Sequence, residues 1–145
     1  MADEPQLPPP PDPRMLPVLA AVTYAAAVIA LFGFVSLALN VDAIAQRDAG
    51  PLLGPAMVLG AVVVTFVALL RVRARSAPTV AALVAATSVY VAMLAIGAFG
   101  YALIRADVSW LVLFVGAYAL SPFVIGAALL SGVAVVAVWA ATRRA

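Results

Sequence analysis

The chain of 145 residues contains no cysteine, no histidine and no lysine, so arginine is its only basic residue type. Without cysteine it cannot form disulfides, thiolate metal sites, c-type haem attachments or a lipidated thiol. Histidine and lysine are two of the residues that most often serve as general bases or nucleophiles in enzymes. Their absence leaves mainly carboxylates and hydroxyls as the groups that could carry chemistry.

Charged residues of any kind are also scarce. They make up 10% of the chain, whereas hydrophobic residues make up 67%, and the mean hydropathy is +1.19. About a quarter of the residues in a soluble domain are charged, and a soluble fold of this size could not bury so much apolar surface. The net charge of +2 gives no basis for a nucleic-acid partner. The expected partner is the lipid bilayer.

The few charges leave four long uncharged runs, at residues 15–41, 49–70, 76–104 and 108–142. Each exceeds the roughly 20 residues that a helix needs to cross a bilayer. Only helices or closed barrels satisfy their backbone in hydrocarbon, and the runs lack the alternating pattern of barrel strands. We therefore predict an all-α fold, a transmembrane four-helix bundle over residues 15–145. Its spans are expected at about 16–39, 52–70, 78–104 and 108–142, with the third at the centre.

The fourth run has two possible structures. It covers 35 residues, which would make a single helix roughly 50 Å long, and Ser121-Pro122 divides it. Proline removes a backbone donor and clashes with the preceding turn, so we predict a kinked or interrupted helix at Pro122. We favour one kinked helix from about Val108, with Asp107 as its N-cap. The alternative is a break at Ser121, with Trp110–Leu120 as a separate interfacial or re-entrant segment.

The arginines predict the orientation in the membrane. Six of the eight lie on one side if there are four spans. They are Arg14, Arg71, Arg73, Arg75, Arg143 and Arg144. Only Arg47 and Arg105 lie on the other side. Because basic residues stay in the cytoplasm, both termini are expected there, in a multi-pass protein of the plasma membrane. The proline-rich residues 1–14 are predicted to form a disordered cytoplasmic tail.

The positions of the acidic residues give no sign of an active site. All six acids lie in the tail or in the connections between spans, whereas ionisable groups that work within a membrane lie at depth. Asp42 and Asp48 could bind a cation, but we favour their interpretation as the ordinary polar content of a short loop. No nucleotide-binding or zinc-protease motif is present. We therefore predict a protein that is not an enzyme, with no catalytic, cofactor-binding or metal site.

Small residues recur within the spans at the spacing of one helix face. Such faces allow two helix backbones to approach closely in a membrane. The predicted helix-packing residues are Ala81, Ala85, Ser88, Ala92 and Ala95 of the third span, with Gly33, Gly60 and Gly132 of the other spans. Hydroxyl side chains within the spans could line a polar pore, but packing between helices is the interpretation that we favour.

Four Ala/Val/Leu-rich spans, a proline-rich tail and arginine as the only base resemble the uncharacterised small integral membrane proteins of high-GC bacteria. This resemblance implies no activity and no site residues. The leading hypothesis is a non-enzymatic accessory or scaffold subunit that acts by helix packing, with a membrane-protein partner or a second copy of itself. The alternative is a small pore or carrier for a neutral or lipid-like solute.

Overall fold

The computed structural model describes residues 15–44, 48–72 and 77–144. The predicted disordered tail at residues 1–14 lies outside the described residues, as do Arg47, Arg73 and Arg75. Within the described ranges the chain forms five helices and no strand. They are α1 Leu16–Leu39, α2 Leu53–Val72, α3 Pro78–Arg105, α4 Ser109–Tyr118 and α5 Pro122–Arg144.

Four of these helices, α1, α2, α3 and α5, are long and apolar enough to cross a membrane. The helix α4 is apolar but has only 10 residues, about half the length that a span requires. The chain is thus an all-α, multi-pass membrane protein.

The helix ends follow from a few residues with restricted backbones. Prolines begin α3 and α5, where a missing N–H removes no helical hydrogen bond. The helices α1 and α3 end at Asn40 and Ala106, both of which are left-handed with φ 51°. The Asn40 N–H then bonds the Ser36 carbonyl, and the Ala106 N–H bonds carbonyls of the last turn of α3. These contacts satisfy carbonyls that a helix end would leave unpaired.

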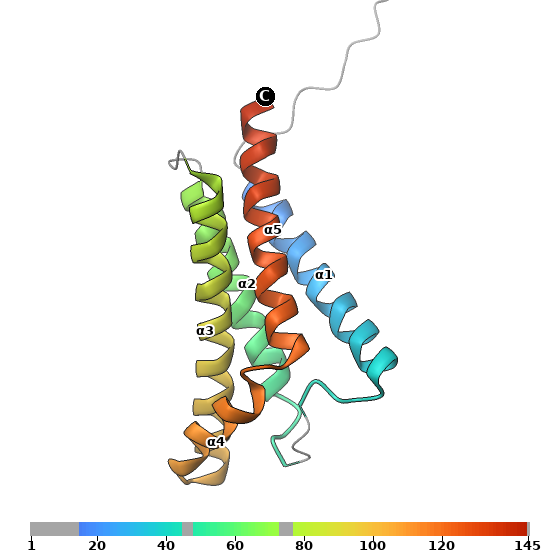
Figure 1. The fold of residues 1–145 in the computed structure, drawn as a ribbon, viewed down its shortest axis with the longest axis vertical. Helices are drawn as coiled ribbons and strands as arrows, with labels where there is room; N and C mark the ends of the chain where they lie inside the picture. The colour runs from blue at the N-terminus through green and yellow to red at the C-terminus, as the bar shows by residue number, and fades with distance from the viewer. Residues whose placement is uncertain (1–14, 45–47, 73–76, 145) are drawn as a thin grey trace, which may run out of the picture.

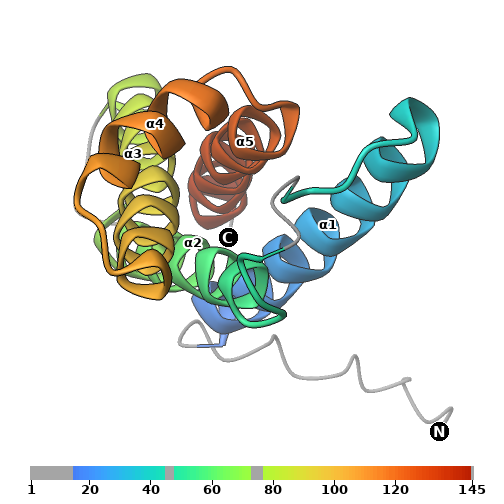
Figure 2. The same cartoon turned by 90° about the horizontal axis from the view of Figure 1, so that it is seen from below.

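The predicted central position of α3 is met only in part, because α2 and α5, not α3, each pack against all three other membrane-length helices. The helix α3 packs against α2, α4 and α5, whereas α1 packs against α2 and α5. Figure 1 shows α3 and α5 side by side along most of their length, with α2 behind them. Both views show α1 diverging from the other helices toward its C-terminal end (Figures 1 and 2). The bundle is therefore compact where α2, α3 and α5 meet and open beside α1.

The fourth segment is interrupted at Pro122 and does not form the single kinked helix that we favoured. After α4 the chain leaves the helix at residues 119–121, and α5 starts at Pro122. Pro122 has no N–H for the Tyr118 carbonyl, which instead accepts a hydrogen bond from the Ser121 N–H at 3.0 Å. The Ala119 carbonyl, also freed by the break, accepts one from the Tyr90 hydroxyl at 2.9 Å. Because both carbonyls find partners, a break inside an apolar region is tolerated.

Candidate functional site

The buried face of α3 is a row at four-residue spacing that contains Ala81, Ala85, Val89 and Met93. Two members of the predicted packing set, Ala81 and Ala85, lie in this row. Ala92 and Ala95 are half-buried, and Ser88 is exposed. The predicted set mixes steps of four residues with steps of three, and these two steps lead in different directions around a helix. The set therefore leaves the buried row after Ala85.

The three predicted packing glycines have different surroundings. A Cβ on Gly60 would collide with the Ile96 side chain, and one on Gly132 would lie 3.4 Å from the Ala82 carbonyl oxygen. Both glycines thus allow close contact with α3. For Gly33, nothing lies within 4 Å of the Cβ position apart from its own chain neighbours and helix backbone. The surface of α1 around Gly33 is not used by the described part of the bundle.

The predicted topology arginines that can be placed lie at one end of the molecule. Arg71 is in the last turn of α2, and Arg143 is near the end of α5 with its guanidinium 4.2 Å from the centre of the Trp139 ring. Arg144 is the last residue of α5, at the same end. Arg73 and Arg75 belong to the connection outside the described residues. The side of the membrane on which this end lies stays a prediction.

Three hydroxyl groups meet in the middle of the bundle. The Thr65 hydroxyl of α2 donates to the Ser131 hydroxyl of α5 at 3.0 Å, and both residues are fully buried. The Tyr24 hydroxyl of α1 donates to the Ala127 carbonyl of α5 at 3.0 Å and also interacts with Thr65. No buried side-chain polar atom of the described residues lacks a partner. This cluster links α1, α2 and α5, and it has no acid or base to move a proton.

A second polar cluster lies at the opposite end from Arg71. The Arg105 Nε is 2.9 Å from the Asp48 Oδ2, and the buried Tyr101 donates its hydroxyl to the same carboxylate at 3.1 Å. Arg105 also lies over the Trp110 ring, 4.8 Å from its centre. Asp48 is therefore engaged with Arg105 and is not available for the cation site that we weighed with Asp42. The cluster fastens the connection before α2 to α3 and α4.

Asp107 lies one residue before the N-cap of α4, which is Val108 and not Asp107 as predicted, but its side chain bonds Ser109, the first residue of the helix. Its Oδ1 accepts hydrogen bonds from the Ser109 hydroxyl at 2.7 Å and the Ser109 N–H at 2.9 Å. Both bonds favour the ionised carboxylate, so they lower the pKa of Asp107 below its ordinary value of 3.8. The Asp107 carboxylate thus links the connection after α3 to the first residue of α4.

A large cavity that could hold a ligand lies beside α1. It has a volume of about 590 Å³ and is lined almost wholly by apolar side chains of α1, α2 and the start of α5, including Ala25, Phe32 and Val58. A neighbouring cavity of about 330 Å³ has Asp42 and Ser121 in its lining, and the two share Ala43, Tyr118 and Phe123. Together they form an apolar space with polar groups at one end, which is the usual composition of a ligand pocket.

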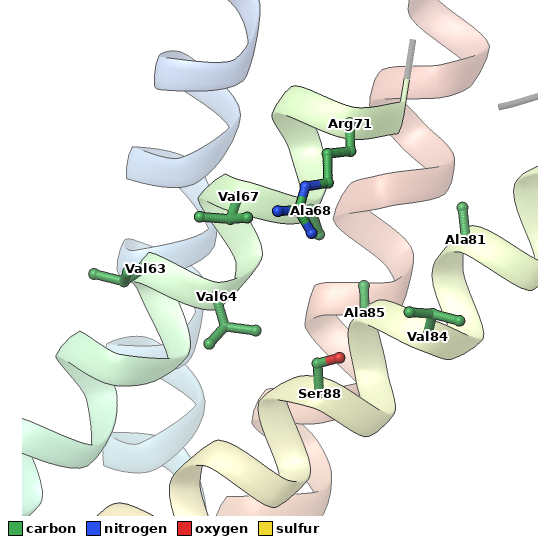
Figure 3. Close-up of a pocket in the computed structure, with 9 residues that line it drawn as sticks. All are labelled: Val63, Val64, Val67, Ala68, Arg71, Ala81, Val84, Ala85 and Ser88. Carbon is green, nitrogen blue, oxygen red and sulfur yellow. The ribbon is translucent and has the colours of Figure 1, made fainter. Parts of the chain in front are cut away.

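A smaller groove lies between α2 and α3 at the arginine end. It has a volume of about 210 Å³, and Figure 3 shows the Arg71 side chain extending over it from the last turn of α2. The lining residues are Val63, Val64, Val67, Ala68 and Arg71 of α2, with Ala81, Val84, Ala85 and Ser88 of α3.

Comparison with known proteins assigns the chain at the level of its family. The model of one family matches residues 13–144, which include all five helices. The chain belongs to a family of unknown function (DUF6121). No curated protein and no solved structure matches it.

Sequence reasoning missed the tyrosines that hold this architecture. Tyr24, Tyr90 and Tyr101 each bond a partner at least 29 residues away in the chain. Their position within the long uncharged runs was visible in the sequence, but no local pattern identifies the partner of each hydroxyl. A buried tyrosine hydroxyl usually has a hydrogen-bond partner. That rule predicts that a bond is made, but it does not identify the residue that accepts it.

Proposed function

We propose that this chain is a non-enzymatic accessory or scaffold subunit of the bacterial plasma membrane, acting by helix packing. The observation that carries the proposal is the surface of α1 around Gly33. Glycines in α2, α3 and α5 allow close contact within the bundle, as Gly60, Gly97 and Gly126 do. Gly33 has no such role, although small residues are the ones that admit a second helix in a membrane.

The rest of this α1 surface is also exposed and apolar. Ala26 and Ala30 are exposed on the turns that precede Gly33, and α1 diverges from the bundle at this end (Figure 2). Large side chains beside the small ones are also exposed, with Phe34 at 71% and Leu37 at 84%. A partner helix that packs on Gly33 would cover these side chains as well.

The chemistry of the described residues supports a role without catalysis. The Asp48 carboxylate is paired with Arg105, the Asp107 carboxylate is bonded to Ser109, and the buried hydroxyls of α1, α2 and α5 bond one another or backbone. Groups that are already satisfied stabilise a fold and have little capacity to bind or activate a substrate.

Isolation of the full chain in mild detergent tests the proposal. We expect a stoichiometric membrane-protein partner, or a dimer, that Gly33→Leu reduces at least severalfold. Gly116→Leu is the matched control, because Gly116 on α4 also has an open Cβ position. Equal recovery of the partner with both variants, or no stoichiometric partner at all, would contradict the role proposed for α1.

The orientation is part of the same proposal, with both termini in the cytoplasm. A reporter that is active only in the cytoplasm should be active when fused after Ala145 and inactive when inserted near Ala49. Replacing Arg71, Arg73 and Arg75 together should give mixed topology. The reverse reporter pattern would overturn the orientation.

A second candidate function rests on the cavity of about 590 Å³ beside α1. A space of this size and apolar lining suits a lipid-like solute, in keeping with a small carrier or pore. Flux of such a solute into vesicles that contain only the purified chain would support it. Ala25→Phe should fill the cavity and abolish flux, whereas Ala26→Phe, on the exposed side of α1, should spare it and weaken partner binding instead.

A further inference from the structure

The groove between α2 and α3 combines a small-residue floor with one charged side chain. Ala81 and Ala85 form part of its lining and are buried, while Val67 and Val84 on the two helices are 37% and 47% exposed. The groove exists because alanines lie where larger side chains would meet between the helices. Its volume of about 210 Å³ is enclosed by apolar groups except at Arg71 and Ser88.

Arg71 has no acidic partner among the described residues. It is exposed in the last turn of α2, whereas the described carboxylates Asp42, Asp48 and Asp107 all lie in the connections at the other end of the bundle (Figure 1). The partial negative charge at the end of α2 favours a cation there but does not neutralise it. Arg73 and Arg75 follow in the sequence and add charge of the same sign.

We propose that this groove binds one anionic phospholipid, with the phosphate on Arg71 and an acyl chain along the alanine floor. A guanidinium binds phosphate through two parallel hydrogen bonds, which an ammonium cannot do. The apolar lining below Arg71 offers an acyl chain contact with both helices, and no described carboxylate repels the phosphate. This inference is independent of the accessory role, since it uses another face of the bundle and needs no protein partner.

The distribution of charge in the groove favours an anionic lipid over other occupants. Such a lipid carries a negative head group and an apolar chain in one molecule, and the groove offers one cation, Arg71, beside an apolar lining that runs between α2 and α3.

Lipid binding to the purified full-length chain in detergent tests the proposal. Native mass spectrometry would compare dioleoyl phosphatidylglycerol with dioleoyl phosphatidylcholine, which has the same chains and no net charge. We expect preferential binding of phosphatidylglycerol. Arg71→Gln should weaken it about fivefold to tenfold, the value of one interfacial arginine. Ser88→Leu should weaken it to a similar degree by filling the groove.

Two matched variants serve as controls. Arg143→Gln removes a charge at the same end of the molecule, from a residue that packs on Trp139. Thr87→Leu makes the same kind of change as Ser88→Leu at an exposed neighbour outside the groove lining. Both should leave the preference for phosphatidylglycerol within about twofold of the original.

Three outcomes would overturn the proposal. Equal binding of the two lipids would show that the groove does not recognise the negative charge of the head group. An equal loss with Arg143→Gln would mean general attraction to the basic end, and competition by glycerol 1-phosphate alone would mean that only the head group is bound. Because Arg71 and Ser88 lie on different helices, either variant decides the question if the other fails to fold.

Discussion

The Tyr90 hydroxyl of α3 donates a hydrogen bond of 2.9 Å to the Ala119 carbonyl, in the break between α4 and α5. In a continuous helix that carbonyl would accept the N–H of Phe123. The break removes this bond within an apolar part of the chain, and α3 replaces it from the side. The helix α3 thus stabilises the interruption that Pro122 causes.

Replacing Tyr90 with phenylalanine should therefore destabilise the protein. Tyr90→Phe leaves the Ala119 carbonyl without its partner, and we expect the free energy of unfolding to fall by about 1 kcal/mol. Reversible unfolding in detergent would measure the change. Thr23→Val is a suitable control, because the Thr23 hydroxyl is exposed and bonds only the Leu19 carbonyl of its own helix. A similar loss in both variants would argue against a special role for Tyr90.

The hydrogen bond between Thr65 and Ser131 should appear as an energetic coupling between α2 and α5. Thr65→Val removes the donor to the buried Ser131 hydroxyl, and Ser131→Ala removes the acceptor for Thr65, which keeps its contact with Tyr24, so each should lower the free energy of unfolding. The double variant should lose less than the sum of the single losses, with a coupling of about 0.6 kcal/mol and an upper limit near 1.7 kcal/mol. Strictly additive losses would mean that the two hydroxyls do not stabilise each other.

The buried row of α3 predicts a contrast between two neighbouring small residues. Ala85 is 1% exposed, so Ala85→Leu should overpack the contact with the adjoining helices and cost about 1–3 kcal/mol. Ser88→Leu, on the exposed side, should leave the free energy of unfolding within about 0.5 kcal/mol of the original. Thermal unfolding of both variants in detergent would decide. If Ser88→Leu were the more harmful, the face predicted from small-residue spacing would be the packed one.

Asp107 predicts a pH dependence at the start of α4. Its pKa is lowered in the fold by bonds from Ser109, so the stabilisation that it contributes is present above its ordinary pKa of 3.8. That contribution is lost as the pH falls through the lower pKa of the folded state, when the carboxylate takes up a proton.

Unfolding measured from about pH 6 down to pH 3 would detect this loss. The stability difference between the original protein and Asp107→Ala should shrink as the pH falls. Asp42→Asn is the control, since no described residue donates a hydrogen bond to Asp42 in the structure. This variant should lose stability at low pH in the same way as the original protein. An unchanged difference across the range would exclude a role for the Asp107 charge.

The sequence by itself determined the class of the protein and where its chain turns. Long runs without charge can satisfy their backbone in a bilayer only as helices or a closed barrel, and Pro78 begins a helix where its missing N–H removes no helical hydrogen bond. The N-cap predicted at Asp107 is one residue from the observed one, Val108, and the Asp107 side chain bonds the start of α4 because its contact with Ser109 is local, only two residues along the chain. Such features depend on neighbours in sequence, so a pattern suffices to predict them.

The tertiary structure alone decided which faces meet. Small residues at helical spacing occur on several sides of these spans, and apolar side chains point to lipid as readily as to protein, so hydrophobicity does not distinguish the two. Ser88 was predicted to pack and is exposed, whereas Val89 is buried. The break at Ser121, like the bond that stabilises it from Tyr90, depends on how α3 lies against the fourth segment. Contacts between residues far apart in the chain can be predicted only when the arrangement of the helices is known, and the local sequence does not specify that arrangement.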